Sequence, residues 1–281
     1  MEGLGWKAFT LHLIPYTINL QCMLHLLKIE WLKVKNYRAF WIFLALYIIS
    51  LYGINQIAFS LQGEIKKNNV PVNIFPYDFP AVYQTIAWVS SWLLYFPGML
   101  IILVITNEYN FKTHRQNIID GLTRQQFVVA KILFGTAIAL ITTISCFLIA
   151  AYFGSSYSGI FSFNGIEYIG YSFIQTLCYL FLAMILAVLM RRSGLAMAVF
   201  FLYGLVFEQL IGGLIDYKIL GNGTMHFYFP LEASDVLIPI TFASGIIYKN
   251  APSQTVLLIV CLIYISLFIF LSLRKFKTDD L

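Results

Sequence analysis

The most informative shortage in this chain is of charge. Only 11% of its 281 residues are charged, whereas soluble domains are typically about a quarter charged. Hydrophobic residues make up 60% of the chain, and its mean hydropathy is +0.80. This balance excludes an ordinary soluble domain and indicates a polytopic membrane protein. The net charge of +5 is modest, and the basic residues lie at the ends of apolar runs, which argues against nucleic-acid binding.

The sequence also lacks the common motifs of catalysis and nucleotide binding. It contains no G-x-x-x-x-G-K-[ST] phosphate loop, no H-E-x-x-H zinc motif and no G-x-S-x-G nucleophile turn. Its four histidines share no spacing typical of metal ligands. The four cysteines form no C-x-x-C pair, so we interpret them as small buried hydrophobes. We therefore expect a protein that is not an enzyme and holds no cofactor or metal.

No stretch has the pattern of a cleaved signal peptide. Residues 1–22 are apolar but are interrupted by His12, Pro15 and Asn19. They are either an amino-terminal extension or lie ahead of the true initiator, for which Met23 is the candidate. We expect residues 23–281 to form a single membrane domain.

Six apolar runs dominate that domain, each near the roughly 20 residues needed to cross about 30 Å of hydrocarbon. Backbone polar groups cannot stay unpaired in lipid, and the runs are too long and too continuously apolar for barrel strands. The predicted fold is therefore an all-α membrane protein with six transmembrane helices. Pro97 and Gly98 predict a kink within the second span. The runs cover residues 40–61, 81–106, 128–153, 168–190, 194–215 and 255–273.

Two shorter stretches indicate further helices. Residues 23–38 intersperse apolar residues with lysines and suggest an amphipathic helix in the membrane interface, although a basic flank of the first span would look similar. In the connection between the fifth and sixth spans, residues 236–247 are apolar and are opened by Ser234 and Asp235. This piece is too short to span, so it is either a re-entrant element or a helix packed on the outer face.

The distribution of basic residues predicts the orientation. With the amino terminus in the cytoplasm, that side collects fourteen of the eighteen Lys and Arg residues. The positive-inside rule therefore places both termini, and the polar segment 107–131, in the cytoplasm. The four basic residues on the other side are Lys66, Lys67, Lys218 and Lys249.

The polar segment 107–131 predicts a short helix held between the second and third spans. Two capping boxes, Thr113 with Gln116 and Thr123 with Gln126, mark two helix starts ten residues apart. Gly121 supplies a natural stop for the first helix, which leaves roughly two turns, or about 10 Å. A short rigid helix at the cytoplasmic end of two spans could serve as a coupling device.

Glu208 is the one carboxylate placed inside a predicted span. An ionisable group in hydrocarbon costs roughly 2.5 kcal/mol or more, so it is expected to face the bundle interior or water. One interpretation is a place in a transport path, and the other is a structural hydrogen bond or an interfacial position. The first leads to an alternative function, a secondary transporter driven by an ion gradient through Glu208.

The order of residues between the second and third spans supports a resemblance. An acidic residue is followed by Thr and Arg, a Gly turn, a Thr-Arg pair and then a Lys at the start of the third span. With an amphipathic entry helix, six spans and no ATP site, the chain resembles the membrane subunit of an ABC type-2 transporter. The residues concerned are Glu108, Thr113, Arg115, Gly121, Thr123, Arg124 and Lys131.

The resemblance implies a permease subunit of an ATP-driven exporter in the cell membrane, with residues 23–38 as its elbow helix. ATP would be bound by a separate ATPase subunit, which would grip the short cytoplasmic coupling helix. Six spans make half a transporter, so a second copy or a sister permease is expected as a partner. The expected contacts with the ATPase are Glu108, Thr113, Arg115, Ile118, Ile119, Asp120 and Arg124, with the two isoleucines as the apolar anchor.

Overall fold

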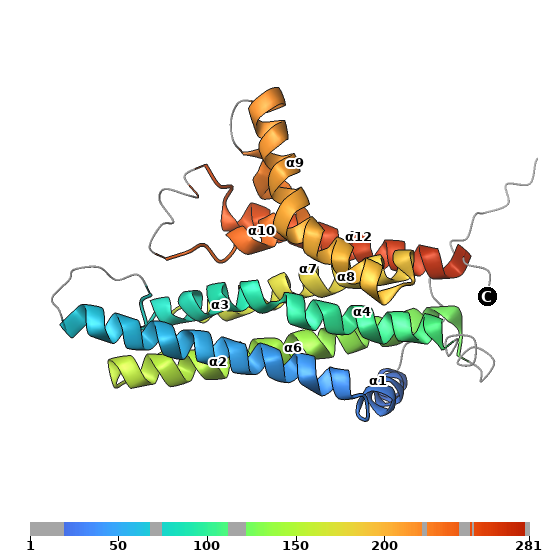
Figure 1. Ribbon diagram of the computed structural model, residues 1–281, viewed down its shortest axis with the longest axis horizontal. Helices are drawn as coiled ribbons and strands as arrows, with labels where there is room; N and C mark the ends of the chain where they lie inside the picture. Colours follow the sequence, from blue (N-terminus) through green and yellow to red (C-terminus); the bar gives the residue numbers. More distant parts are fainter. Residues whose placement is uncertain are drawn as a thin grey trace, which may run out of the picture.

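The protein is an elongated bundle of α-helices (Figure 1). The computed structural model describes residues 20–67, 75–111, 122–220, 224–241, 248 and 250–278, and no strand occurs among these residues. Five of its helices are long and apolar enough to cross a membrane, or up to six if one bent helix pair counts as a single span. The prediction of an all-helical, multi-pass membrane protein is confirmed at this level.

Each of the six predicted spans lies within helical structure. The first, third, fourth and sixth correspond to single unbroken helices, and the second to a bent pair. The fifth is interrupted by one π-helical turn and followed by another. The helices are α1 (Leu20–Val34), α2 (Arg38–Lys67), α3 (Ala81–Leu93), α4 (Tyr95–Asn110), α6 (Arg124–Ser158), α7 (Glu167–Met190), α8 (Ser193–Leu202), α9 (Glu208–Ile215), α10 (Pro230–Val236) and α12 (Gln254–Thr278). The π-helical turns are η1 (Tyr203–Phe207) and η2 (Asp216–Leu220), and a short 3-10 helix is η3 (Met225–Tyr228).

The predicted kink in the second span is confirmed. The axes of α3 and α4 differ by 41° across Leu94. Pro97 has no N–H to donate to the carbonyl of Leu93, which lies four residues earlier, and its ring crowds the preceding turn. The helix resumes at once, because the Gly98 amide donates to the Leu94 carbonyl at 3.0 Å.

Gly98 also allows α4 to approach α8 closely. A methyl group built on Gly98 would lie 2.5 Å from a ring carbon of Phe200, whose side chain is fully buried. We expect Gly98→Ala to lower the free energy of unfolding by about 1–3 kcal/mol through overpacking. Thermal unfolding in detergent measures the effect, with Gly53→Ala as the control because no atom lies within 4 Å of its added methyl group. Equal melting temperatures for the two variants would contradict this packing.

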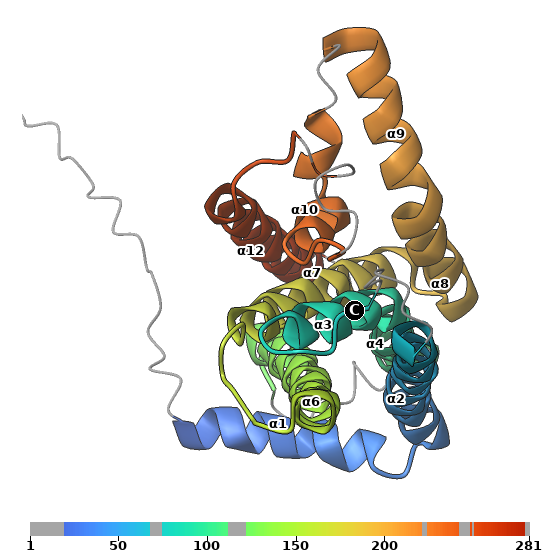
Figure 2. The same cartoon turned by 90° about the vertical axis from the view of Figure 1, so that its left-hand side faces the viewer.

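Helix α7 is the centre of the bundle. In the most apolar 18-residue stretch of α7, 72% of the residues are buried, whereas the corresponding values are 22% for α2 and 28% for α12. It packs against α12, α4, α6 and α3, which surround it in the end-on view of Figure 2. An apolar helix covered on all sides is the core of a bundle, whereas its partners retain apolar faces that suit contact with lipid.

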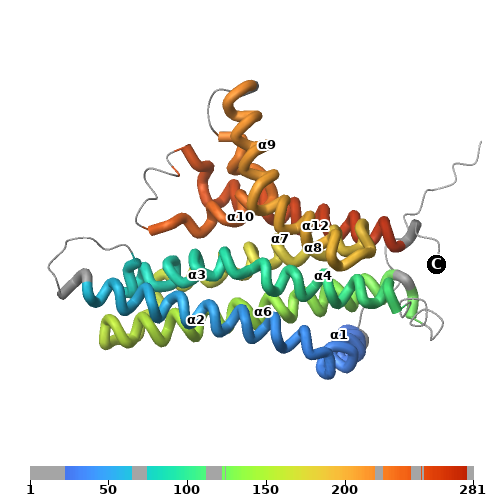
Figure 3. The backbone as a smooth tube through the Cα atoms, viewed as in Figure 1, coloured from blue at the N-terminus to red at the C-terminus, as the bar shows by residue number. Residues whose placement is uncertain are grey.

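The fifth predicted span departs from the bundle. Helix α8 lies against α4 and α7, but α9 rises away from the other helices (Figures 1 and 3). Only 17% of the most apolar window of the span Ser193–Lys218 is buried. Its outer face carries exposed apolar side chains, including Leu205, Leu210 and Leu214.

Helix α1 lies across the ends of the bundle helices rather than along them (Figure 2). It begins and ends a few residues before the limits expected for the amphipathic helix of residues 23–38. Leu26 and Val34 are buried against the bundle, whereas Leu24, Trp31 and Leu32 are exposed. Helix α1 therefore has one face packed against the rest of the protein and another face exposed.

The connection before α12 differs from the expectation. Helix α10 begins at Pro230, and the described residues that follow it, 237–241, are not helical. Ser234 and Asp235 therefore lie near the end of α10 rather than ahead of the apolar stretch 236–247, of which residues 242–247 lie outside the described residues. Proline at the first position of a helix fixes a favourable φ and loses no hydrogen bond, which explains the earlier start. Leu237 and Ile238 are completely buried, so this segment is packed into the protein.

Candidate functional site

Four charged side chains meet where α1 crosses α4 and α6. Lys131 of α6 contacts Glu30 of α1 at 2.5 Å and Glu108 of α4 at 2.6 Å. Lys33 of α1 contacts the same carboxylates, at 2.8 Å for Glu30 and 3.0 Å for Glu108. We call Glu30, Lys33, Glu108 and Lys131 the charge tetrad. It alternates two ammonium groups with two carboxylates, so its net charge is zero.

The charge tetrad is buried rather than solvated. The side chains of Lys131 and Glu30 are each 2% exposed, and that of Glu108 is 8% exposed. Charges withdrawn from water at this level are tolerated only when they are paired and hydrogen-bonded. The ring of Phe127 lies 5.2 Å from the Lys131 ammonium and 5.9 Å from that of Lys33. This ring adds cation–π attraction on the apolar side of the tetrad.

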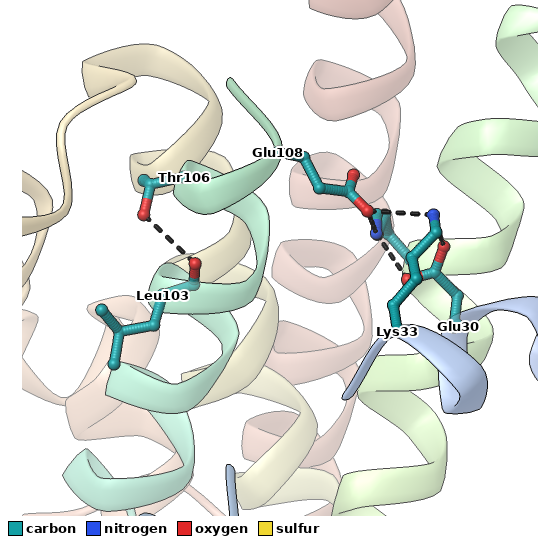
Figure 4. A network of polar contacts seen from close by, with 6 residues as sticks. Glu30, Lys33, Leu103, Thr106 and Glu108 are labelled. Carbon is teal, nitrogen blue, oxygen red and sulfur yellow. Dashed lines mark hydrogen bonds and ion pairs between the residues drawn. The ribbon is translucent and has the colours of Figure 1, made fainter. Parts of the chain in front are cut away.

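Glu30 shows how the charge tetrad balances burial against charge. Burial of its carboxyl opposes ionisation, but the neighbouring ammonium groups of Lys131 and Lys33 outweigh this effect and hold the pKa of Glu30 below its ordinary value. Figure 4 shows the Glu108 carboxylate pointing toward Lys33 and Glu30, while the hydroxyl of Thr106, two residues earlier, donates within its own helix. The charge tetrad therefore holds α1 firmly to the ends of α4 and α6.

These ends flank the predicted coupling helix. Helix α4 ends at Asn110 and α6 begins at Arg124. The second predicted capping box is confirmed. The Thr123 hydroxyl accepts from the backbone N–H of Gln126 at 3.2 Å, and the side-chain oxygen of Gln126 accepts from the backbone N–H of Thr123 at 2.9 Å. Residues 112–121, with the first capping box, lie outside the described residues.

The predicted contact residues are distributed accordingly. Glu108 is described and belongs to the charge tetrad. Arg124 opens α6, but its side chain lies outside the described residues. The remaining predicted contacts also lie outside them, namely Thr113, Arg115, Ile118, Ile119 and Asp120.

Glu208 is buried, as expected for a carboxylate within a span. Its side chain is 3% exposed, and one of its oxygens accepts from the backbone N–H of Leu231 at 2.8 Å. This contact joins α9 to the start of α10. This hydrogen bond agrees with the interpretation that Glu208 has a structural role. It does not test a role in transport.

Asp235, on α10, was not identified as a candidate site residue from the sequence. It accepts from the Gln175 amide at 2.8 Å and from the Tyr179 hydroxyl at 3.1 Å, both on the central helix α7. Burial raises the pKa of Asp235 to about 7, and the nearby charge of Glu232 adds to the rise. Helix α10 belongs to none of the candidate spans.

Metal binding finds no support in this geometry. Among the described residues, no three His, Cys, Asp or Glu side chains are grouped closely enough to hold a metal ion. Cys146, Cys178 and Cys261 are buried free thiols, as predicted, and the side chain of Cys22 lies outside the described residues.

Comparison with known proteins adds no relative. No family model matches the chain, and no curated protein matches its sequence.

Proposed function

We propose that this chain is the permease subunit of an ATP-driven exporter similar to ABC type-2 transporters. A separate ATPase subunit supplies the energy and binds the cytoplasmic helix expected around Thr113 to Gly121. The proposal is supported by the apolar spans, by the order of residues from Glu108 to Lys131, and by the absence of a phosphate-loop motif from the sequence.

The observation that carries this proposal is the charge tetrad. It joins α1 to the end of α4 and the start of α6, the two helices that residues 112–121 connect. Buried ion pairs resist separation strongly, because parting them leaves an uncompensated charge. A force applied to residues 112–121 would therefore move the three helices together rather than bend one of them.

The same proposal places the protein in the cell membrane. Both termini lie in the cytoplasm by the distribution of basic residues, and α1 lies in the cytoplasmic interface as the elbow helix. Its exposed Trp31 and Leu32 would then contact lipid. A second copy or a sister permease completes the transporter.

The proposal is tested by copurification from solubilised membranes. The tagged protein is expected to bring down a phosphate-loop ATPase in about equal amount. Charge reversal at both Arg115 and Arg124 should abolish that recovery without preventing membrane insertion, because these side chains provide the polar contacts. Lys35→Glu is the matched control, since Lys35 is an exposed cation at the same end of the molecule. Unchanged recovery with the double variant would refute the contact assignment.

One observation favours a second candidate, a transporter driven by an ion gradient. Glu208 lies within the candidate span Ser193–Lys218, and its carboxylate has no ion pair with a described Lys or Arg. Such groups are typical of proton and ion pathways. Transport in vesicles that persists without ATP and stops when the gradient is collapsed would favour this candidate.

A further inference from the structure

An apolar groove lies along one flank of α1. It has a volume of about 330 Å³, which falls within the range of roughly 300–1,000 Å³ that is typical of small-molecule sites. One wall is formed by Leu24, Leu27 and Trp31 of α1, and the opposite wall belongs to α6. The face of α1 that packs on the bundle carries Leu26 and Glu30 instead. The groove is therefore a surface of α1 separate from the one that the charge tetrad holds.

The α6 wall of the groove runs along the helix axis. It presents Phe134, Ala137, Ile138 and Ile141, whose spacing of three and four residues places them on one face of α6. The step of seven residues from Phe134 to Ile141 covers about 10 Å at 1.5 Å rise per residue. Ile141 lies near the middle of the candidate span Gln125–Ser158, whereas α1 crosses the end of the bundle (Figure 2). The groove therefore extends from the end of the bundle toward the middle of the span, the direction of an extended lipid chain.

Aromatic rings join the two walls of the groove. The ring centroid of Phe40, near the start of α2, lies 5.9 Å from that of Trp31 and 6.3 Å from that of Phe134. Phe40 and Phe134 are buried, whereas Trp31 remains exposed. Among the described residues that line the groove, Lys28 is the one charged residue. Because apolar cavities stay dry, a hydrocarbon chain rather than water is suited to fill this groove in a membrane.

Lys28 places a positive charge at the α1 edge of the groove. It is exposed, and no ion pair joins it to a described Asp or Glu. Lys35 is also exposed and lies seven residues further on, almost two helical turns, so it falls on the same flank. The helical turn continues this far, because the Lys35 amide donates to the Trp31 carbonyl at 2.9 Å. Glu30, the one acidic residue of α1, belongs to the neutral charge tetrad, which leaves this flank with a net positive charge.

We propose that this groove binds one acyl chain of an anionic phospholipid, whose phosphate group is held by Lys28. The chain packs along Phe134, Ala137 and Ile141, while the aliphatic stem of Lys28 borders the groove and its ammonium group reaches the headgroup. Basic side chains beside a pocket between membrane helices favour anionic headgroups. The bound lipid fastens the flank of α1 that the charge tetrad does not hold. Placing the lipid in the cytoplasmic leaflet rests on the proposed function, whereas the binding itself rests on the groove and its charge.

The site is tested by native mass spectrometry of the full-length protein, delipidated in detergent and titrated with phosphatidylglycerol or phosphatidylcholine carrying the same acyl chains. Phosphatidylglycerol is expected to bind the tightest site about fivefold more strongly, the factor that one lysine near an anionic headgroup contributes. Free glycerol phosphate should not displace the lipid, because the groove holds the chain. Equal affinity for the two lipids, or displacement by glycerol phosphate, would overturn the proposal.

A charge variant locates the headgroup. Lys28→Gln is expected to remove most of the preference for phosphatidylglycerol, and because Lys28 is exposed the variant should still fold. Arg192→Gln is the matched control, since Arg192 is an exposed cation just before α8 and does not line the groove. A preference that survives Lys28→Gln, or that is lost equally in Arg192→Gln, would show that the headgroup binds elsewhere and would refute the assignment.

A groove-filling variant locates the chain. Ala137→Trp should weaken binding of both lipids at least about tenfold, because fewer methylene groups of the chain can be buried. Ala45→Trp is the control, since Ala45 is an exposed alanine of α2 outside the groove. Unchanged binding by a folded Ala137→Trp protein would contradict the proposal. Neither ATP nor an ATPase is present in these titrations, so a negative result leaves the copurification test of the permease proposal unaffected.

Discussion

Lys131→Met is expected to lower the free energy of unfolding by about 3–5 kcal/mol, the usual cost of removing one partner from a buried ion pair. Lys131 is 3% exposed and binds both carboxylates of the charge tetrad. Without it, Glu30 and Glu108 retain only Lys33 as their cationic partner in the tetrad, and Lys33 is more exposed to solvent. The measurement is unfolding of the purified protein in detergent at neutral pH.

A second substitution separates the loss of stability caused by unbalanced charge from the loss caused by altered packing. Lys131→Met combined with Glu108→Gln restores a balance of one cation and one anion, so we expect it to recover part of the lost stability. Lys35→Met, at an exposed position just beyond α1, should change stability by less than about 0.5 kcal/mol. If Lys131→Met were as stable as Lys35→Met, the buried ion pairs would not hold α1 to the bundle.

The features set by local chemistry were predictable from the sequence. The spans follow from runs of apolar residues, since a helix in lipid needs little more than length and hydrophobicity. The Thr123–Gln126 capping box involves residues three apart and forms as predicted. The bend near Pro97 follows from a missing backbone donor.

The charge tetrad was not predictable, because its members come from three distant segments. Glu30 and Lys33 resemble the polar face of an interfacial helix, and Lys131 resembles a topology signal at the end of a span. In the sequence, Glu108 and Lys131 are separate positions of the family pattern, and nothing in that pattern indicates that they touch. The pairing depends on α1 crossing the ends of α4 and α6, which is a matter of tertiary packing.

Helix α10 illustrates a second limit. The helix begins at Pro230, although the longer apolar stretch follows Asp235, and that stretch is not helical where it is described, at 237–241. The sequence alone marks Asp235 only as a residue ahead of an apolar piece that is either re-entrant or packed on the outer face. In the structure it contacts Gln175 and Tyr179 of the most buried helix, which gives it a different chemical environment.

The second large effect is expected from Asp235→Asn, which should make the protein more stable at pH 8 by a few kcal/mol. Burial raises the pKa of Asp235 to about 7, with Glu232 adding to the rise, whereas the unfolded chain has the ordinary value of 3.8. Between these values the folded protein holds a proton that the unfolded chain has released. The stabilising contribution is therefore complete below about pH 4 and is lost as pH rises through about 7, at up to 1.36 kcal/mol per unit.

Asparagine carries no charge and can still accept from the Tyr179 hydroxyl, so the variant should lack this loss. Asp235 accepts hydrogen bonds from Gln175 and Tyr179 and interacts electrostatically with the carboxylates of Glu208 and Glu232. Tyr95, Cys178 and Tyr248 also face its charge, and His226 acts on Glu232. Removing the Asp235 charge relieves its repulsion with the neighbouring carboxylates at pH 8, which adds to the gain in stability expected for the variant. We expect the stability difference between variant and parent, compared at pH 5 and pH 8, to grow with pH for Asp235→Asn and to stay constant for the exposed Glu167→Gln. A stability difference for Asp235→Asn that does not change between pH 5 and pH 8 would refute the raised pKa.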